Sequence, residues 1–174
     1  RGNKKRPLLN SGANAADTTT LFNNAQAAHR AGRLKEARAG YKRVLKANSR
    51  HFEATHMLGV IALQRQQYKG AISFIEKSIS QTENPSSAQL SNLGEAYRRA
   101  GDTLRGRDLF CQAVELDPAN HESRFNLGLT SLDLNDAEGA VEAFTKLLEL
   151  VPTAVDLWPH LAEAYLKAGR KEQA

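Results

Sequence analysis

Residues 121–154 read HESRFNLGLTSLDLNDAEGAVEAFTKLLELVPTA and contain two patterns that are typical of amphipathic helices. The pair Leu127-Gly128 lies near the centre of the first pattern, and Ala140 and Phe144 lie in the second. A proline comes after the second pattern, and proline cannot continue a helix. The stretch therefore predicts two helices that are joined by a tight turn and followed by a stop.

The same arrangement recurs along the chain at a nearly constant spacing. The small residue of the first helix lies at positions 25, 59, 94, 128 and 162, which are 34, 35, 34 and 34 residues apart. A small residue and a larger one recur in the second helix, as Ala37 and Tyr41, Ala71 and Ile75, Gly106 and Phe110, and Ala140 and Phe144. Self-similarity of this period indicates a solenoid of stacked helix pairs.

The small residues have a packing reason. Gly59, Gly94 and Gly128 lie where the second helix is expected to cross the first, and a missing side chain allows close contact. The larger second-helix residues then fill the space between successive pairs, which gives a core that no single pair could form alone.

These positions make the chain resemble the tetratricopeptide repeat family over about residues 18–174. The resemblance implies an all-α, right-handed superhelical solenoid with four complete repeats and a truncated fifth. The expected repeats are residues 18–51, 52–86, 87–120, 121–154 and 155–174. The family's turn glycine is present as Gly32, Gly101 and Gly169, whereas Gln66 and Asn135 replace it twice. Asn tolerates the left-handed conformation more readily than Gln does.

The basic charge is concentrated at the start of the chain. The formal net charge is +5, and four positive charges come from Arg1, Lys4, Lys5 and Arg6. Without them, 20 basic side chains face 19 acidic ones, so the folded part does not favour nucleic acid as a partner. Residues 1–17 are expected to form a basic, flexible arm, either a solvated leader or a contact for nucleic acid or an acidic partner.

No pattern of catalytic or metal-binding residues is evident. The five histidines include no pair at the i, i+4 spacing of two ligands on one helical face. The single cysteine, Cys111, cannot form an intramolecular disulfide and is expected to face the core, with a redox role as the alternative. We therefore expect no enzyme activity, no metal and no cofactor in this chain. With neither a membrane span nor a signal peptide evident, the cytoplasm is the expected location.

The resemblance also implies where a ligand binds, because in this family the first helix of each repeat lines the concave side. The expected groove residues are Phe22, Gln26 and His29, then His56, Val60 and Leu63, then Ser91, Glu95 and Arg98 with neighbouring Arg99, then Phe125, Leu129 and Leu132, then Pro159, Glu163 and Leu166. The Phe125 stripe either accepts a partner's side chains or is buried by a neighbouring repeat. Arg98 and Arg99 either hold a carboxylate or phosphate or are solvated helix-end charges.

Asparagines provide a second indication of the groove. Asn23, Asn92 and Asn126 precede the Leu of the repeated pair or its equivalent, where an amide can donate to and accept from a peptide backbone. This resembles the asparagine ladder of O-linked N-acetylglucosamine transferases and their bacterial relatives. Met57 and His160 interrupt it. The alternative is that each Asn bonds to the neighbouring repeat.

Two functions are compatible with these patterns. The first is a scaffold or adaptor that binds a peptide or protein segment in the concave groove. The alternative is the substrate-recruiting N-terminal region of a larger glycosyltransferase or sulfotransferase with a catalytic domain beyond Ala174, since residues 34–37 (LKEA) and 56–60 (HMLGV) are similar to the opening repeats of such proteins. Self-association through an uncapped C-terminal edge is also expected, because repeat arrays normally end in a polar capping helix.

Overall fold

A computed structural model describes residues 11–174 of the chain, with side chains from Asp17 onward. The predicted contacts of Arg1, Lys4, Lys5 and Arg6 lie outside these residues. Every regular element in the described part is a helix, and the bounds are α1 Ser11–Arg30, α2 Leu34–Ala47, α3 Phe52–Gln64, α4 Tyr68–Ile79, α5 Ser87–Ala100, α6 Thr103–Leu116, α7 His121–Asp133, α8 Ala137–Leu150, the short 3₁₀ helix η1 Val155–Leu157, and α9 Trp158–Lys167.

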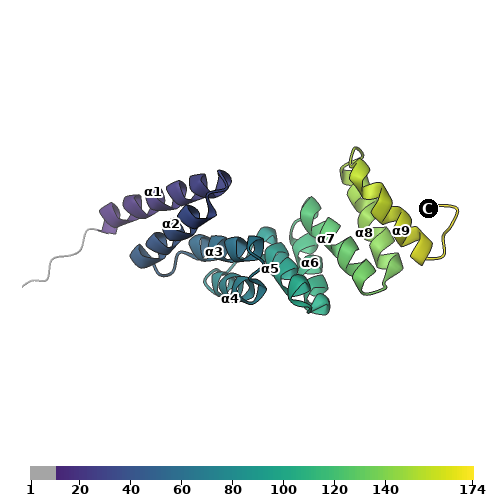
Figure 1. Cartoon of the computed structure of the whole chain (residues 1–174), viewed down its shortest axis with the longest axis horizontal. Coiled ribbons are helices and arrows are strands. Elements are labelled where there is room, and N and C mark those ends of the chain that lie inside the picture. The colour runs from purple at the N-terminus through teal and green to yellow at the C-terminus, as the bar shows by residue number, and fades with distance from the viewer. Residues whose placement is uncertain (1–10) are drawn as a thin grey trace, which may run out of the picture.

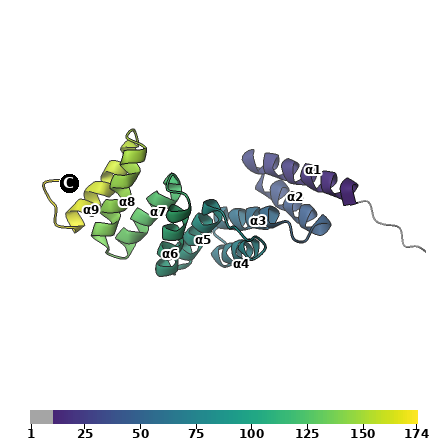
Figure 2. The same cartoon turned by 180° about the vertical axis from the view of Figure 1, so that it is seen from behind.

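The helices form a row of hairpins. Figure 1 shows them following one another along the long axis of the molecule, from α1 at one end to α9 at the other, and Figure 2 shows the same order from behind. The most extensive contacts join α1 to α2, α3 to α4, α5 to α6 and α7 to α8. The prediction of an all-α solenoid is therefore confirmed.

The turn that follows each first helix uses a residue in the left-handed conformation. Gly32, Gly101 and Gly169 have φ values of 72°, 95° and 77°. Gln66 and Asn135 occupy the same place in the two hairpins that lack the glycine, with φ values of 58° and 60°. The left-handed backbone conformation of the turn is thus kept even at residues whose side chains disfavour it.

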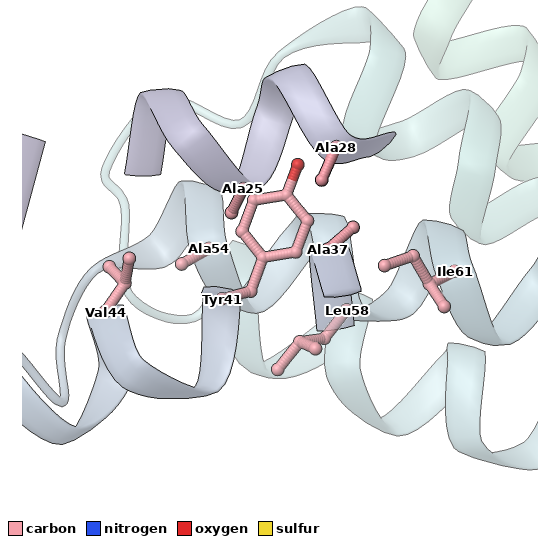
Figure 3. Close-up of a cluster of buried hydrophobic side chains, with 8 residues drawn as sticks. All are labelled: Ala25, Ala28, Ala37, Tyr41, Val44, Ala54, Leu58 and Ile61. Carbon is pink, nitrogen blue, oxygen red and sulfur yellow. The ribbon is translucent and has the colours of Figure 1, made fainter. Parts of the chain in front are cut away.

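The glycines of the first helices lie directly under the large residues of the second helices. A Cβ atom added to Gly128 would lie 2.4 Å from Cε1 of Phe144, and one added to Gly59 would lie 2.5 Å from Cγ1 of Ile75. Tyr41, which holds the position of Phe144 in the first hairpin, is fully buried. Figure 3 shows its ring among alanines of α1, α2 and α3. The packing reason inferred for the small residues therefore holds.

Two contacts between successive hairpins differ in chemistry. The apolar junction joins α2 to α3, and its buried side chains are Tyr41, Val44, Ala54, Leu58 and Ile61. The polar junction joins α5 and α6 to α7, and its members are Ser87, Ala113, Asn120, Ser123 and Arg124. In it Ser87 Oγ donates to the Ala113 carbonyl at 2.8 Å and accepts from Asn120 Nδ2 at 2.7 Å.

The two ends of the array differ in detail from the expectation. Helix α1 already begins at Ser11, so residues 11–17 of the predicted arm are helical. At the other end Pro159 lies in the first turn of α9, where its missing N–H costs little. Residues 168–174 form turns rather than a helix. No helix within residues 11–174 has both the length and the apolar character needed to cross a membrane.

Candidate functional site

The first helices of successive repeats are linked by side-chain pairs, which we call the first-helix ladder. Three of its steps are hydrogen bonds and one is a ring contact. The hydrogen bonds join His29 Nε2 to Gln64 Oε1 at 3.0 Å, Asn92 Nδ2 to His56 Nε2 at 3.1 Å, and Arg98 Nη1 to Asp133 Oδ2 at 3.1 Å. The rings of Phe125 and His160 lie edge to face with centroids 5.5 Å apart.

The ladder follows a register rule. Its hydrogen-bonded partners are 35 or 36 residues apart, one more than the repeat length beside them. Each residue therefore contacts, in the following repeat, the position one residue after its own equivalent. This geometry places predicted groove residues on one continuous face and ties adjacent repeats together along it.

His56 and Asn92 form the central step. Burial lowers the pKa of His56 to about 4, so the imidazole is neutral at pH 7. Because Asn92 Nδ2 donates to Nε2, the ring proton is on Nδ1. Asn92 therefore does bond to the neighbouring repeat, the alternative considered for these asparagines, while its carbonyl oxygen makes no bond to another described residue.

A charged cluster comes next on α5. Glu95 accepts from Arg98 Nε at 3.0 Å and from Arg99 Nε at 2.7 Å. The Arg98 side chain also reaches Asp133 and is only 15% exposed, whereas that of Arg99 is 55% exposed. Arg98 thus links α5 to α7, and Arg99 is the more accessible cation. Asp133, at the end of α7, is the exposed partner of Arg98.

The apolar stripe of α7 is mostly covered by the protein itself. Leu132 is 7% exposed, and Phe125 and Leu129 are half-buried against the cluster that contains Phe144 and α9 residues. Of the two alternatives for this stripe, burial against a neighbouring repeat therefore describes Leu132, while Phe125 and Leu129 keep part of their surface.

The remaining predicted groove residues differ in accessibility. Phe22 is half-buried, with its ring 4.8 Å from that of His51. Ser91 is buried. Half-buried residues also include Gln26, Val60, Leu63 and Asn126, and exposed ones are Asn23, Pro159, Glu163 and Leu166. Glu163 pairs with Lys167 at 2.9 Å.

Sequence reasoning missed Gln64 and placed Cys111 differently. Gln64 lies at the end of α3 and becomes a ladder partner only through the offset of adjacent repeats. Cys111 is half-buried and lines a cavity between α6 and α8, outside the apolar core clusters. Burial raises the pKa of its thiol. Within residues 11–174, no group of three His, Cys, Asp or Glu side chains is arranged to hold a metal ion.

Comparison with known families agrees with this architecture. The tetratricopeptide repeat model matches residues 22–88, 91–155 and 132–174, and the chain belongs to this family. It is 32% identical over 85 residues to the TPR repeat-containing protein C19B12.01 of Schizosaccharomyces pombe, covering 48% of this chain and 10% of that protein. It is 20% identical over 140 residues to anaphase-promoting complex subunit 3 of the same organism, covering 80% of this chain and 21% of that protein. The chain thus spans a small part of these relatives.

Solved structures share the fold. The MamA structure superimposes with a TM-score of 0.79 at 22% identity and covers 90% of this chain and 85% of MamA. YrrB, described as a TPR protein with an unusual peptide-binding site, gives a TM-score of 0.75 at 21% identity and covers 88% of this chain and 78% of YrrB. Likeness at this identity establishes the shared solenoid.

Proposed function

We propose that this chain is a protein-interaction module that binds an extended peptide segment along the face of its first helices. The observation that carries the proposal is the recurrence of Asn23, Asn92 and Asn126 at one position of α1, α5 and α7 with unused hydrogen-bonding capacity. Asn23 and Asn126 make no side-chain bond to another described residue, and Asn92 keeps a free carbonyl oxygen. Amides of this kind can pair with a peptide backbone whatever its sequence.

The ladder supports the same proposal, because it orders the face that carries these amides before any ligand binds. His56 holds Asn92 in place, and the Arg98–Asp133 pair joins α5 to α7 next to it. A face that is already ordered loses less entropy when it binds. Arg99, with its exposed guanidinium, supplies a site for a carboxylate of the bound segment.

An array of immobilised peptides of about 12 residues, which extend over about 40 Å, tests this function. The double variant Asn92→Ala/Asn126→Ala removes two backbone-pairing amides, so the peptides that the unmodified chain captures should bind about tenfold more weakly or worse. Circular dichroism should show an unchanged helix content.

Gln112→Ala is the matched control, because Gln112 is an exposed amide on the second helix α6. Capture that is lost equally in the control and in the double variant would place the binding surface elsewhere. Capture that survives the double variant unchanged would refute a role for the asparagines.

The substrate-recruiting alternative uses the same face. It rests on the opening-repeat motifs at residues 34–37 and 56–60, and it differs only in requiring a catalytic domain beyond Ala174 in the parent protein. The intact mass of the native parent discriminates the two. A parent near 20 kDa favours an adaptor, whereas a parent several times larger favours a recruiting region.

Self-association through the α9 end is a separate proposal. Trp158 and Leu166 are more than half exposed there, and Val155 is exposed beside them. Sedimentation velocity should show a concentration-dependent rise in mass that Trp158→Ser/Leu166→Ser removes. A constant monomer mass at all concentrations would refute it.

A further inference from the structure

The fourth repeat departs from the third at two positions that face the second helices. Arg124 and Ser131 on α7 are each 34 residues after Leu90 and Tyr97 on α5. A buried leucine and a large aromatic ring are thus replaced by a cation and a small hydroxyl. These residues lie at the base of the surface depressions between successive second helices, and the two depressions therefore differ.

Tyr97 occupies the depression between α4 and α6. Its hydroxyl donates to Glu76 on α4, and the Arg105 guanidinium on α6 lies over its ring with Cζ 5.3 Å from the centroid. Leu90 lies two helical turns before Tyr97 and is buried. The protein's own side chains therefore fill this depression around Tyr97, whereas Leu90 lines a separate cavity of about 440 Å³ near Asn84 and Leu116.

The corresponding depression between α6 and α8 is open. Ser131 does not reach across it, and a cavity of about 510 Å³ remains. A volume of this size lies within the range of small-ligand sites. The cavity wall combines apolar and polar groups, among them Cys111, Val114, Arg124, Leu127, Ser131 and Ala143.

Arg124 gives this cavity its chemistry. The residue is only 8% exposed, and its Nη2 donates to the Pro118 carbonyl at 2.9 Å. Its buried Nε makes no hydrogen bond, and no ion pair of Arg124 with a carboxylate is found among the described residues. A buried guanidinium with a spare donor and no counter-charge is costly unless an anion completes it.

Most other charged side chains around the cavity already form ion pairs or hydrogen bonds within the protein. Arg107 lies 3.7 Å from Asp108, and Lys146 pairs with Glu142. Asp136 accepts from the backbone N–H of Gly139 at the start of α8. Glu115 is the one lining carboxylate with neither an ion pair nor a hydrogen bond in the described part of the chain. With four carboxylates against three cations, the lining disfavours a ligand that carries two negative charges.

We propose that this cavity binds a monoanionic carboxylate attached to an apolar body, with the carboxylate on Arg124 and the body against Val114, Leu127 and Ala143. The source is either the C-terminal residue of a partner chain or a free aromatic or aliphatic acid. The site lies between second helices, on a face other than that of the first-helix ladder, so it is independent of the function proposed above.

The chain carries a reporter for this site, because Cys111 is its single cysteine and lines the cavity. The probes are 3-phenylpropionate with its neutral amide, the tripeptide Gly-Gly-Phe with its C-terminal amide, and inorganic phosphate. Two signals are measured, the rate at which a disulfide reagent modifies Cys111 and the NMR shift of the Arg124 Nε–H group. Either carboxylate should slow modification and move the Arg124 signal, and its amide should bind about tenfold more weakly.

Three variants test the assignment, and two of them borrow residues from the third repeat. Arg124→Leu restores the leucine of position 90 and should abolish the difference between acid and amide. Ser131→Tyr should fill the cavity and protect Cys111 without any ligand. Glu115→Gln removes a rim charge on an exposed residue and should tighten carboxylate binding about twofold to threefold.

The relative affinity of the free acid and the tripeptide identifies the source of the ligand. Equal effects of acid and amide, binding of phosphate as tight as that of the carboxylates, or unchanged selectivity in Arg124→Leu would each overturn the proposal. If Arg124→Leu does not fold, the surface variant Glu115→Gln decides, since unchanged carboxylate affinity in that variant contradicts the site.

Discussion

The apolar and polar junctions connect hairpins of the same design through different interactions. In the apolar junction Leu58 and Ile61 are removed from water, and burial of this kind stabilises by about 25 cal/mol for each Å² of apolar surface. In the polar junction Ser87 and Asn120 form hydrogen bonds, each of which contributes about 1 kcal/mol net. The repeat tolerates both because the contact that fixes each hairpin, a small residue against a large one, lies inside the hairpin. Junction chemistry is therefore free to vary, and cavities can form where it does.

The largest expected effect on the free energy of unfolding comes from comparing one leucine of the apolar junction with its equivalent in the fourth repeat. Leu58 and Leu127 are equivalent, but Leu58 is buried whereas Leu127 is half-buried and lines the cavity. Leu58→Ala should lower the free energy of unfolding by about 3 kcal/mol and Leu127→Ala by only about 1 kcal/mol, measured by urea denaturation. Leu116→Ala, at an exposed position, is the control. Equal losses at Leu58 and Leu127 would remove the distinction between the junctions.

A change of pH tests the N-terminal half of the array, because that half contains the half-buried His56. Its pKa is about 4 in the folded chain and about 6.5 in an unfolded one, so only the unfolded chain takes up the proton between these values. The free energy of unfolding should therefore fall as the pH drops from 6.5 to 4, by up to about 1.4 kcal/mol per pH unit, and this contribution should stop changing below pH 4.

The matched variants isolate this titration. His56→Gln should reduce the pH slope of stability, measured by urea denaturation at several pH values, while His121→Gln at an exposed position should leave it unchanged. An identical slope in the wild-type chain and in His56→Gln would show that His56 has the same pKa in the folded and unfolded chains, contrary to the expected effect of burial.

A smaller effect is expected from the hydrogen bonds of the polar junction. Asn120 caps α7 by accepting from the Ser123 N–H at 2.9 Å and also donates to Ser87. Asn120→Ala should cost about 2 kcal/mol, since it removes a cap and a hydrogen bond between hairpins. Asp136→Ala removes only the cap of α8 and should cost about 1 kcal/mol. Thermal unfolding of both variants measures the difference, and a cost for Asn120→Ala no greater than that for Asp136→Ala would argue against the contact between hairpins.

The smallest effect concerns one hydroxyl of the apolar junction. Tyr41 is fully buried, its hydroxyl has no hydrogen-bond partner among the described residues, and burial raises its pKa to about 12. Phe110 and Phe144 hold the same position in later hairpins. Tyr41→Phe should therefore leave the free energy of unfolding unchanged or raise it by up to about 1 kcal/mol. A clear loss in the urea midpoint would reveal a partner for the hydroxyl.

The fold could be predicted because its determinants are local and repeat in the sequence. The spacing of Gly59, Gly94 and Gly128 identified the helix crossings, and the substitutions at Gln66 and Asn135 were recognised as left-handed turn positions. The start of α1 was missed because residues 11–17 are small and polar, without the apolar periodicity that marks a helix.

The site was less accessible to sequence reasoning, because it depends on the offset between repeats. The periodicity selected His29, His56 and Arg98 as surface residues of first helices, but their partners lie on the next repeat and depend on how the hairpins stack. The sequence did contain an indication of the cavity, since Arg124 and Ser131 stand at the repeat positions where the third repeat has the large apolar or aromatic residues Leu90 and Tyr97. A charge and a hydroxyl on an amphipathic helix resemble ordinary surface residues until their burial is known.

The order of the helix contacts has a mechanical consequence. Extensive contacts within residues 11–174 join only helices that are adjacent or next but one in the chain, so the first hairpin is connected to the last through the hairpins between them. A force applied to the two ends would accordingly be carried by each hairpin boundary in series, and the array would lengthen in separate steps as hairpins detach. The length of the array under load would then be set by how many of these boundaries remain closed.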